Sequence, residues 1–216
     1  TAALALTACS GSADTDSTTD DTTETTAEPV ELHVFAAASM QESLDQVIEA
    51  YKAVAPEVAV VATYDSSGTL KTQIQEGADC DVFISAAPKQ MNQLDAEGGE
   101  ENTEGLDLVN SATRLDLLEN KVTLAVPEGN PKGIESFDQL AELLAVDCGV
   151  IYATDAFSAG LTVVDEATAE MCGQVIYPAA VMKNSANPDA AKAFLDFLST
   201  DEAMACFEAV GFSPMV

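Results

Sequence analysis

The chain has 216 residues, of which 47% are hydrophobic, and it carries 37 Asp and Glu residues against 8 Lys and Arg, giving a formal net charge of -29. This length and composition predict one large domain or two small lobes with a hydrophobic core. The acidic balance argues against nucleic acid as a partner, because phosphate binding needs a basic patch. Any anion site must therefore act locally, through groups other than Lys and Arg.

The first nine residues, TAALALTAC, are small, apolar and uncharged. They are typical of the end of a secretory signal. Leu6-Thr7-Ala8-Cys9 resembles the lipobox of bacterial lipoproteins, in which the cysteine is acylated and becomes the mature N-terminus. This resemblance predicts a lipid on Cys9 that anchors an extracytoplasmic protein to the cell membrane. A chance cysteine after an ordinary signal peptide is the alternative.

Residues 10–30 are dominated by Ser, Thr, Asp and Glu, and residues 10–29 contain no large apolar side chain. Such a segment buries too little surface to offset the entropy of ordering. We expect it to be a disordered acidic tether. No later segment has the length and apolarity that a bilayer-spanning helix needs.

From residue 31 onward, strand patterns alternate with helix patterns. In the first helix pattern, apolar residues recur at three-to-four spacing at Leu44, Val47, Ile48 and Tyr51. The alternation predicts an α/β fold with mostly parallel sheets. Strands are expected at 31–38, 57–65, 80–87, 121–130, 148–156 and 173–183, and helices at 40–56, 67–77, 88–98, 136–144 and 187–212.

Four further cysteines, Cys80, Cys148, Cys172 and Cys206, form no C-x-x-C motif, so a metal or redox motif has no support. In an exported protein they allow up to two disulfides, whose pairing the sequence leaves open. The single histidine, His33, lies within a predicted strand. Without a second histidine, paired catalytic carboxylates or a metal cluster, the sequence predicts neither an enzyme nor a cofactor.

Two serines follow successive strands. The first strand ends in three alanines, and Ser39 opens the next helix, with Glu42 placed to complete a Ser-x-x-Glu capping box. The second strand is followed by a similar stretch that contains Ser67. In open α/β sheets, ligands bind at the carboxyl ends of strands, where unpaired helical N–H groups favour anions. The pair predicts one shared anionic ligand; the alternative is that both serines only cap helices.

The motifs VFAAASM, YDSSGTL, DCDVFISAAPKQM, VIYATDA, YPAAVMKNSANPDAAKAFLDFL and GFSP occur in this order. As a set they resemble the molybdate-binding proteins of bacterial ABC transporters, over about residues 31–216. The resemblance implies a two-lobed periplasmic-binding-protein (type II) fold with an oxyanion in the cleft. It also implies a monomer that delivers molybdate or tungstate to a membrane permease.

In that family, the serine after the alanines, the middle serine of the second motif and the tyrosine of the fourth motif bind the oxyanion. These positions correspond to Ser39, Ser67 and Tyr152. Molybdate offers only hydrogen-bond acceptors, so hydroxyl and backbone N–H donors suit it. Asp65 and Asp155 are expected to accept hydrogen bonds or fix loops. Sulfate and phosphate remain alternatives, although protonated phosphate needs an acceptor such as one of these aspartates.

The same resemblance divides the chain into lobe 1 at 31–115, completed by helices at 186–216, and lobe 2 at 116–185. Lobe 2 is incomplete, because several tens of residues that the family has are missing near 144–148. In the family, that stretch supplies the remaining backbone donors. We therefore expect weak molybdate binding or a non-binding remnant. Three alternative explanations for this junction stay open: an internal deletion, a faulty gene model, or omitted residues.

Overall fold

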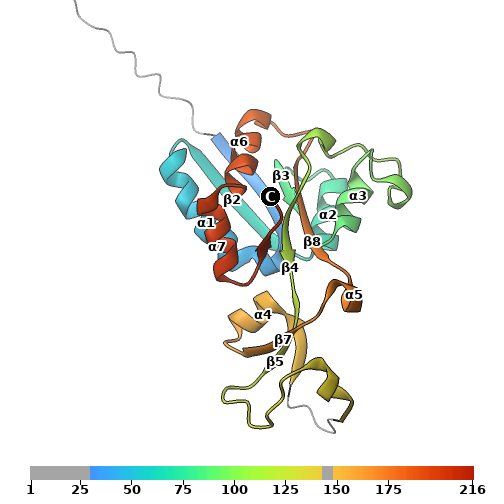
Figure 1. Ribbon diagram of the computed structural model, residues 1–216. Helices are drawn as coiled ribbons and strands as arrows, with labels where there is room; N and C mark the ends of the chain where they lie inside the picture. Colours follow the sequence, from blue (N-terminus) through green and yellow to red (C-terminus); the bar gives the residue numbers. More distant parts are fainter. Residues whose placement is uncertain (1–29, 143–147) are drawn as a thin grey trace, which may run out of the picture.

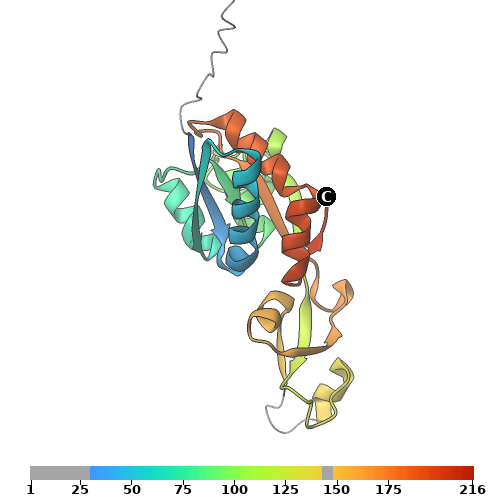
Figure 2. The ribbon, with the colours of Figure 1, turned by 90° about the vertical axis from the view of Figure 1, so that its left-hand side faces the viewer.

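The computed structural model describes residues 30–142 and 148–216, which form two β-sheets with flanking helices (Figure 1). The large sheet has the strand order β2-β1-β3-β8-β4-β9, and the small sheet has the order β6-β5-β7. The two parts lie end to end, so that the molecule is elongated (Figure 2). The predicted two-lobed α/β fold is confirmed.

The elements have the following bounds. The strands are β1 (Val30–Ala37), β2 (Val58–Asp65), β3 (Val82–Ile84), β4 (Leu115–Asn120), β5 (Val122–Val126), β6 (Gly149–Tyr152), β7 (Thr162–Glu166), β8 (Val175–Val181) and β9 (Ser213–Pro214). The helices are α1 (Gln41–Val54), α2 (Ser67–Gln75), α3 (Pro88–Leu94), α4 (Ala153–Ser158), α5 (Ala169–Cys172), α6 (Pro188–Leu198) and α7 (Asp201–Ala209). Short 3-10 helices include η1 (Ala38–Met40), η3 (Ser111–Thr113) and η4 (Phe137–Glu142).

Parallel pairing is confined to β1 and its two neighbours, β2 and β3. The other pairings between named strands in the described residues are antiparallel. The expectation of mostly parallel sheets is therefore corrected. The reason is the connection between the sheets: β4 leads out of the large sheet and β8 returns to it, so β8 runs opposite to both β3 and β4.

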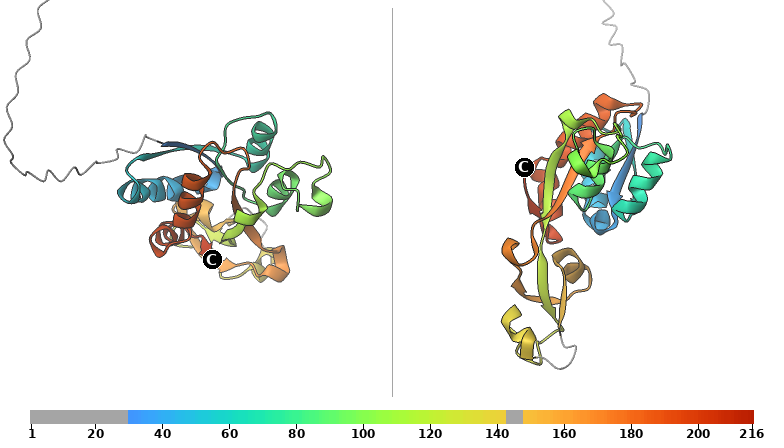
Figure 3. Two further views of the ribbon diagram at one scale, coloured as in Figure 1. Left: turned by 90° about the horizontal axis from the view of Figure 1, so that it is seen from above. Right: turned by 90° about the vertical axis from the view of Figure 1, so that its right-hand side faces the viewer.

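Helices cover both faces of the large sheet, with α1, α6 and α7 on one face and α2 and α3 on the other (Figures 1 and 3). The four periodic apolar residues predicted for α1 are all buried, which confirms that face of the helix. Among them, the Tyr51 ring packs edge-on against Phe194 of α6, with ring centroids 5.0 Å apart. On the opposite face, Leu70 of α2 and Met91 of α3 pack in a second cluster.

Several element boundaries differ from the sequence predictions. The expected C-terminal helix is two helices, because Thr200 accepts a hydrogen bond from the backbone N–H of Ala203 and begins α7 anew. The expected strand at 148–156 ends at Tyr152, where α4 begins. The expected helix at 136–144 is the 3-10 helix η4. Strands β4 and β7 were not predicted, because acidic residues interrupt their apolar patterns.

The four cysteines of the described residues, Cys80, Cys148, Cys172 and Cys206, are all free thiols. No helix in residues 30–142 or 148–216 is long and apolar enough to cross a membrane. Cys9, the tether up to residue 29 and the junction residues up to 147 lie outside the described residues.

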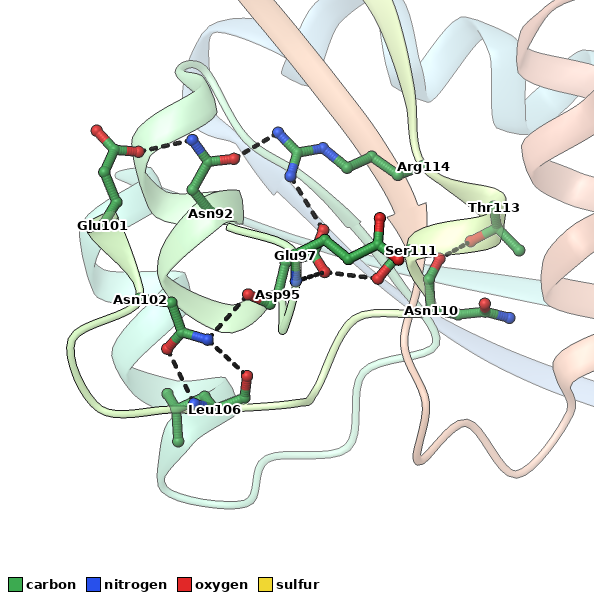
Figure 4. A network of polar contacts seen from close by, with 10 residues as sticks. All are labelled: Asn92, Asp95, Glu97, Glu101, Asn102, Leu106, Asn110, Ser111, Thr113 and Arg114. Atoms are coloured by element: carbon green, nitrogen blue, oxygen red, sulfur yellow. Dashed lines mark hydrogen bonds and ion pairs between the residues drawn. The ribbon is translucent and has the colours of Figure 1, made fainter. Parts of the chain in front are cut away.

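A polar network fixes the start of β4, the strand that leads toward the small sheet (Figure 4). The carboxylate of Asp95 is fully buried and accepts hydrogen bonds from the Ser111 hydroxyl at 2.6 Å and from Arg114 Nη1 at 3.0 Å. Arg114 also donates to the side-chain oxygen of Asn92 in α3, at 2.6 Å. Burial alone would raise the pKa of Asp95, but the hydrogen bonds from Ser111, the Glu97 N–H and Arg114 outweigh it, so this pKa is lowered.

We predict that Asp95→Asn lowers the free energy of unfolding by about 1.5–3 kcal/mol at pH 7, because charged hydrogen bonds to Arg114 and Ser111 are lost. A carboxyl with a lowered folded-state pKa contributes its full stability above its unfolded pKa, about 3.9. That contribution disappears as the pH falls through the folded-state pKa. Urea unfolding of wild type and variant at pH 7 and at about pH 2.5 should therefore show a smaller difference at the lower pH.

Asp107→Asn is the matched control, since Asp107 pairs with Lys183 on the surface. Its effect should stay below about 1 kcal/mol at both pH values. An Asp95→Asn protein as stable as the wild type at pH 7 would contradict the prediction.

Candidate functional site

Ser39 follows β1 but does not cap α1. It lies in the 3-10 turn η1, and α1 begins only at Gln41, with Met40 at the N-cap position and no side-chain cap bond. The predicted capping box of Ser39 with Glu42 is therefore wrong, because the extra turn moves the helix start beyond the serine. Instead, Ser39 Oγ lies 2.8 Å from the Tyr177 hydroxyl oxygen.

In the second serine motif, Ser66 caps the helix, and the predicted site residue Ser67 does not. Ser66 is the N-cap of α2, where its hydroxyl oxygen accepts from the Thr69 backbone N–H at 3.1 Å. Ser67 is the first helical residue, is buried, and accepts from the backbone N–H of Ala86 at 2.8 Å. The interpretation of both predicted serines as helix caps is thus contradicted.

The two predicted serines occupy equivalent places, just after the carboxyl ends of the neighbouring strands β1 and β2. The parallel register pairs Ala37 of β1 with Asp65 of β2, and each serine comes two residues later. Asp65 accepts from the Ser66 backbone N–H at 2.6 Å, which confirms its expected role in fixing this loop.

An open cavity of about 560 Å³ lies between η1 with the start of α1 and the small-lobe helix α4. It contains Ser39 from the large lobe, whereas Ser67 and Tyr152 are not among its lining residues. Tyr152 is the N-cap residue of α4 and is 41% exposed. The lining residues are Ala38, Ser39, Gln41, Glu42, Asp45, Thr154, Asp155 and Ser158.

A chain of hydrogen bonds joins Ser39 to the far side of this cavity. Tyr177 of β8 bonds to Ser39 and receives a 3.3 Å hydrogen bond from the side-chain amide of Asn120, the last residue of β4. The same amide donates to the Thr154 hydroxyl in α4 at 3.0 Å. Thus the network runs from the large lobe, through both connecting strands, to the small lobe.

Tyr177 is held in this network as a neutral phenol. Burial raises its pKa; the hydrogen bonds with Ser39 and Asn120 act in the opposite direction, and the nearby Tyr152 and Asp155 add to the rise. Its ring is 2% exposed and packs edge-on against Phe212, with centroids 5.1 Å apart. The hydroxyl therefore keeps its hydrogen at physiological pH.

Three carboxylates also line the cavity, those of Glu42, Asp45 and Asp155. Glu42 accepts from the Ser158 hydroxyl across the cavity at 3.3 Å, and Asp45 accepts from the Tyr64 hydroxyl at 2.6 Å. In the part of the chain that the structure describes, no group of three His, Cys, Asp or Glu side chains is placed to hold a metal ion. The cavity therefore offers hydroxyl donors beside acidic groups.

Asn120, Thr154 and Tyr177 were not among the predicted site residues. Asn120 belongs to no recognised pattern, and Thr154 stands in the motif VIYATDA, where only the tyrosine was assigned to the site. Contacts this distant in sequence cannot be read from local spacing. Tyr177 does stand in the motif YPAAV, and a tyrosine within an otherwise apolar buried strand is a signal for a buried hydrogen bond.

A protein-family model described as bacterial extracellular solute-binding protein matches residues 32–145 and 142–213. These two segments together cover most of the chain. The two segments overlap at residues 142–145, which include the start of the predicted junction.

Curated relatives match most of the chain. The substrate-binding lipoprotein YvgL of Bacillus subtilis, named for an ABC transporter, is 29% identical over 85% of this chain and 86% of its own length. The molybdate-binding protein ModA of Escherichia coli is 29% identical over 87% of this chain and 90% of its own length. The YvgL alignment runs over 225 positions, whereas 85% of 216 residues is about 184, so about 40 positions of YvgL have no counterpart here.

Solved structures share the fold. A substrate-binding domain from Clostridium difficile, assigned to a molybdenum ABC transporter, superposes with a TM-score of 0.74 and 27% identity, covering 87% of this chain and 100% of that chain. The sulfate-binding protein SubI of Mycobacterium tuberculosis has a TM-score of 0.69 at 16% identity, covering 86% of this chain and 87% of its own. The second likeness shows the fold alone.

Proposed function

Because this chain belongs to the family of bacterial extracellular solute-binding proteins, we propose that it binds the oxyanion molybdate, or tungstate, for delivery to the permease of an ABC transporter. Relatives named for molybdate binding and the Clostridium difficile domain support this ligand. The observation that carries the proposal is the Ser39 hydroxyl, which serves no helix cap and stands at the cavity between the lobes. As a transport component, the protein binds its solute without converting it.

The donor chemistry of the site suits a tetrahedral dianion. Molybdate is deprotonated at neutral pH and offers only acceptors, so serine and tyrosine hydroxyls and backbone N–H groups are fitting partners. Each hydrogen bond to a charged partner contributes about 1.5–3 kcal/mol. We propose Ser39, Ser67 and Tyr152 as oxyanion ligands; no metal or organic cofactor is required.

A second oxyanion, hydrogen phosphate, is favoured by one specific observation. The carboxylate of Asp155 lines the cavity and provides an acceptor for an anion that keeps a proton. Molybdate and tungstate would instead be separated from smaller sulfate by the size of the donor ring. Competition titration with molybdate, tungstate, sulfate and phosphate distinguishes these ligands.

We predict that Ser39→Ala and Ser67→Ala each weaken molybdate binding by about 1.5–3 kcal/mol, through loss of one hydrogen bond to the anion. Isothermal titration with molybdate up to the millimolar range measures the change. Ser66→Ala is the matched control: it removes the α2 cap, which costs about 1 kcal/mol of stability, but leaves affinity unchanged. Unchanged affinity in both Ser39 and Ser67 variants would reject these residues as ligands.

The affinity of the present chain should be low. The cavity of about 560 Å³ is much larger than a five-atom oxyanion, and about 40 positions of a relative are missing. An anion in a half-built shell keeps water on its open side, and losing two charge-assisted donors costs about 3–6 kcal/mol. We expect weak binding by this chain, and at least hundredfold tighter binding after grafting the corresponding YvgL stretch between residues 144 and 148. Submicromolar binding by the ungrafted chain would show that its site is complete.

We further propose that Cys9 carries a lipid that anchors the protein to the cell membrane, with residues 10–30 as the tether. The lipobox pattern and the acidic low-complexity run support this anchor, as does the lipoprotein name of YvgL. Mass spectrometry of protein extracted from its own membrane should show a diacylglyceryl group on Cys9. Cys9→Ser protein should be released into the medium. An unmodified Cys9 on the mature protein would refute the anchor.

A further inference from the structure

We infer that Thr154 is a further donor to the oxyanion, and that Asn120 and Tyr177 are positioning residues that turn the Ser39 and Thr154 hydroxyl hydrogens toward the cavity. This inference rests on the proposed function and adds residues to the same site. Its basis is that each buried hydrogen in the network of Asn120, Tyr177, Ser39 and Thr154 needs an acceptor.

The orientation of the Asn120 side chain is fixed by its own surroundings. The side chain is 2% exposed, and its oxygen accepts from the Lys121 backbone N–H at 2.9 Å. A flipped amide would place its NH₂ group against that N–H. The NH₂ group must therefore point the other way, where its two hydrogens go to Thr154 Oγ1 and to the Tyr177 oxygen.

The direction of the Tyr177 bond follows from this orientation. Because Tyr177 already accepts from Asn120, its single hydrogen needs an acceptor, and Ser39 Oγ lies 2.8 Å away. If Ser39 donated instead, the buried tyrosine hydrogen would be left unpaired, which is costly. The raised pKa of Tyr177 keeps this hydrogen in place. Ser39 is thus the acceptor, and its own hydrogen is free for a ligand.

Thr154 is in the same situation on the opposite lobe. Its hydroxyl oxygen accepts from Asn120, its side chain is 4% exposed, and it lines the cavity. The hydroxyl hydrogen is therefore available on the cavity side. Ser67 is similar, since its oxygen accepts from the Ala86 N–H. Donors within the protein thus occupy these hydroxyl oxygens, and the hydroxyl hydrogens remain available to a ligand. This arrangement suits a ligand made only of acceptors.

The test is titration of the full chain with sodium molybdate up to about 10 mM. Thr154→Val should weaken binding about 10- to 150-fold, the loss of one charge-assisted bond, whereas Thr154→Ser should stay close to wild type. Tyr177→Phe keeps the ring packing on Phe212 but should weaken binding about tenfold or more. In a Ser39→Ala background, Tyr177→Phe should cause no further loss, because it acts through Ser39.

Tyr51→Phe is the matched control. Tyr51 is a buried tyrosine that packs on Phe194 away from the cavity, so its loss of a hydroxyl should leave affinity unchanged. Circular dichroism confirms that each variant is folded. If the wild type binds molybdate and both Thr154→Val and Tyr177→Phe bind equally well, the inference fails while the proposed function stands. If the wild type binds no molybdate at 10 mM, both fail.

Discussion

The buried amide of Asn120 is the interaction on which the arrangement of the two lobes depends. It ends the strand that leads out of the large sheet, and its hydrogen bonds reach α4 directly and η1 through Tyr177. A buried polar group without partners is costly, so moving one lobe against the other would break several bonds together. The network at Asp95 holds the beginning of the same strand against α3. Both ends of β4 are therefore fixed by polar contacts rather than by apolar packing alone.

The proposed site accounts for how a protein with a net charge of -29 could hold an anion. Charges farther than roughly 8 Å are screened by salt, so what matters is the first shell of donors. Two of the three carboxylates that line the cavity already accept internal hydrogen bonds: Glu42 from Ser158 and Asp45 from Tyr64. In the proposed site, hydroxyl groups whose direction is set by neighbouring donors take the place of the lysine or arginine that many anion sites use.

Local patterns in the sequence predicted much of the fold. The apolar spacing of α1 and the strand patterns of β1 and β2 depend on neighbouring residues, so they were readable, and the equivalence of Ser39 and Ser67 followed from them. The capping box at Ser39 failed because a 3-10 turn and a capped α1 have the same local sequence signature. Asn120, Thr154 and Tyr177 come from three distant segments, and only the folded chain brings them together. The roles proposed for them depend on hydrogen-bond direction, which no residue pattern encodes.

The small sheet is the part of the molecule most prone to self-association. Its outer strands, β6 and β7, leave backbone groups unpaired at both edges within the described residues, and Val150, Phe157 and Met171 nearby are about half exposed. Exposed edges beside apolar side chains invite pairing with other chains. At neutral pH, mutual repulsion between highly acidic molecules opposes such contacts. As the solution approaches the isoelectric point near 4.1, this repulsion vanishes, so acidic conditions should bring on self-association that begins at the small lobe.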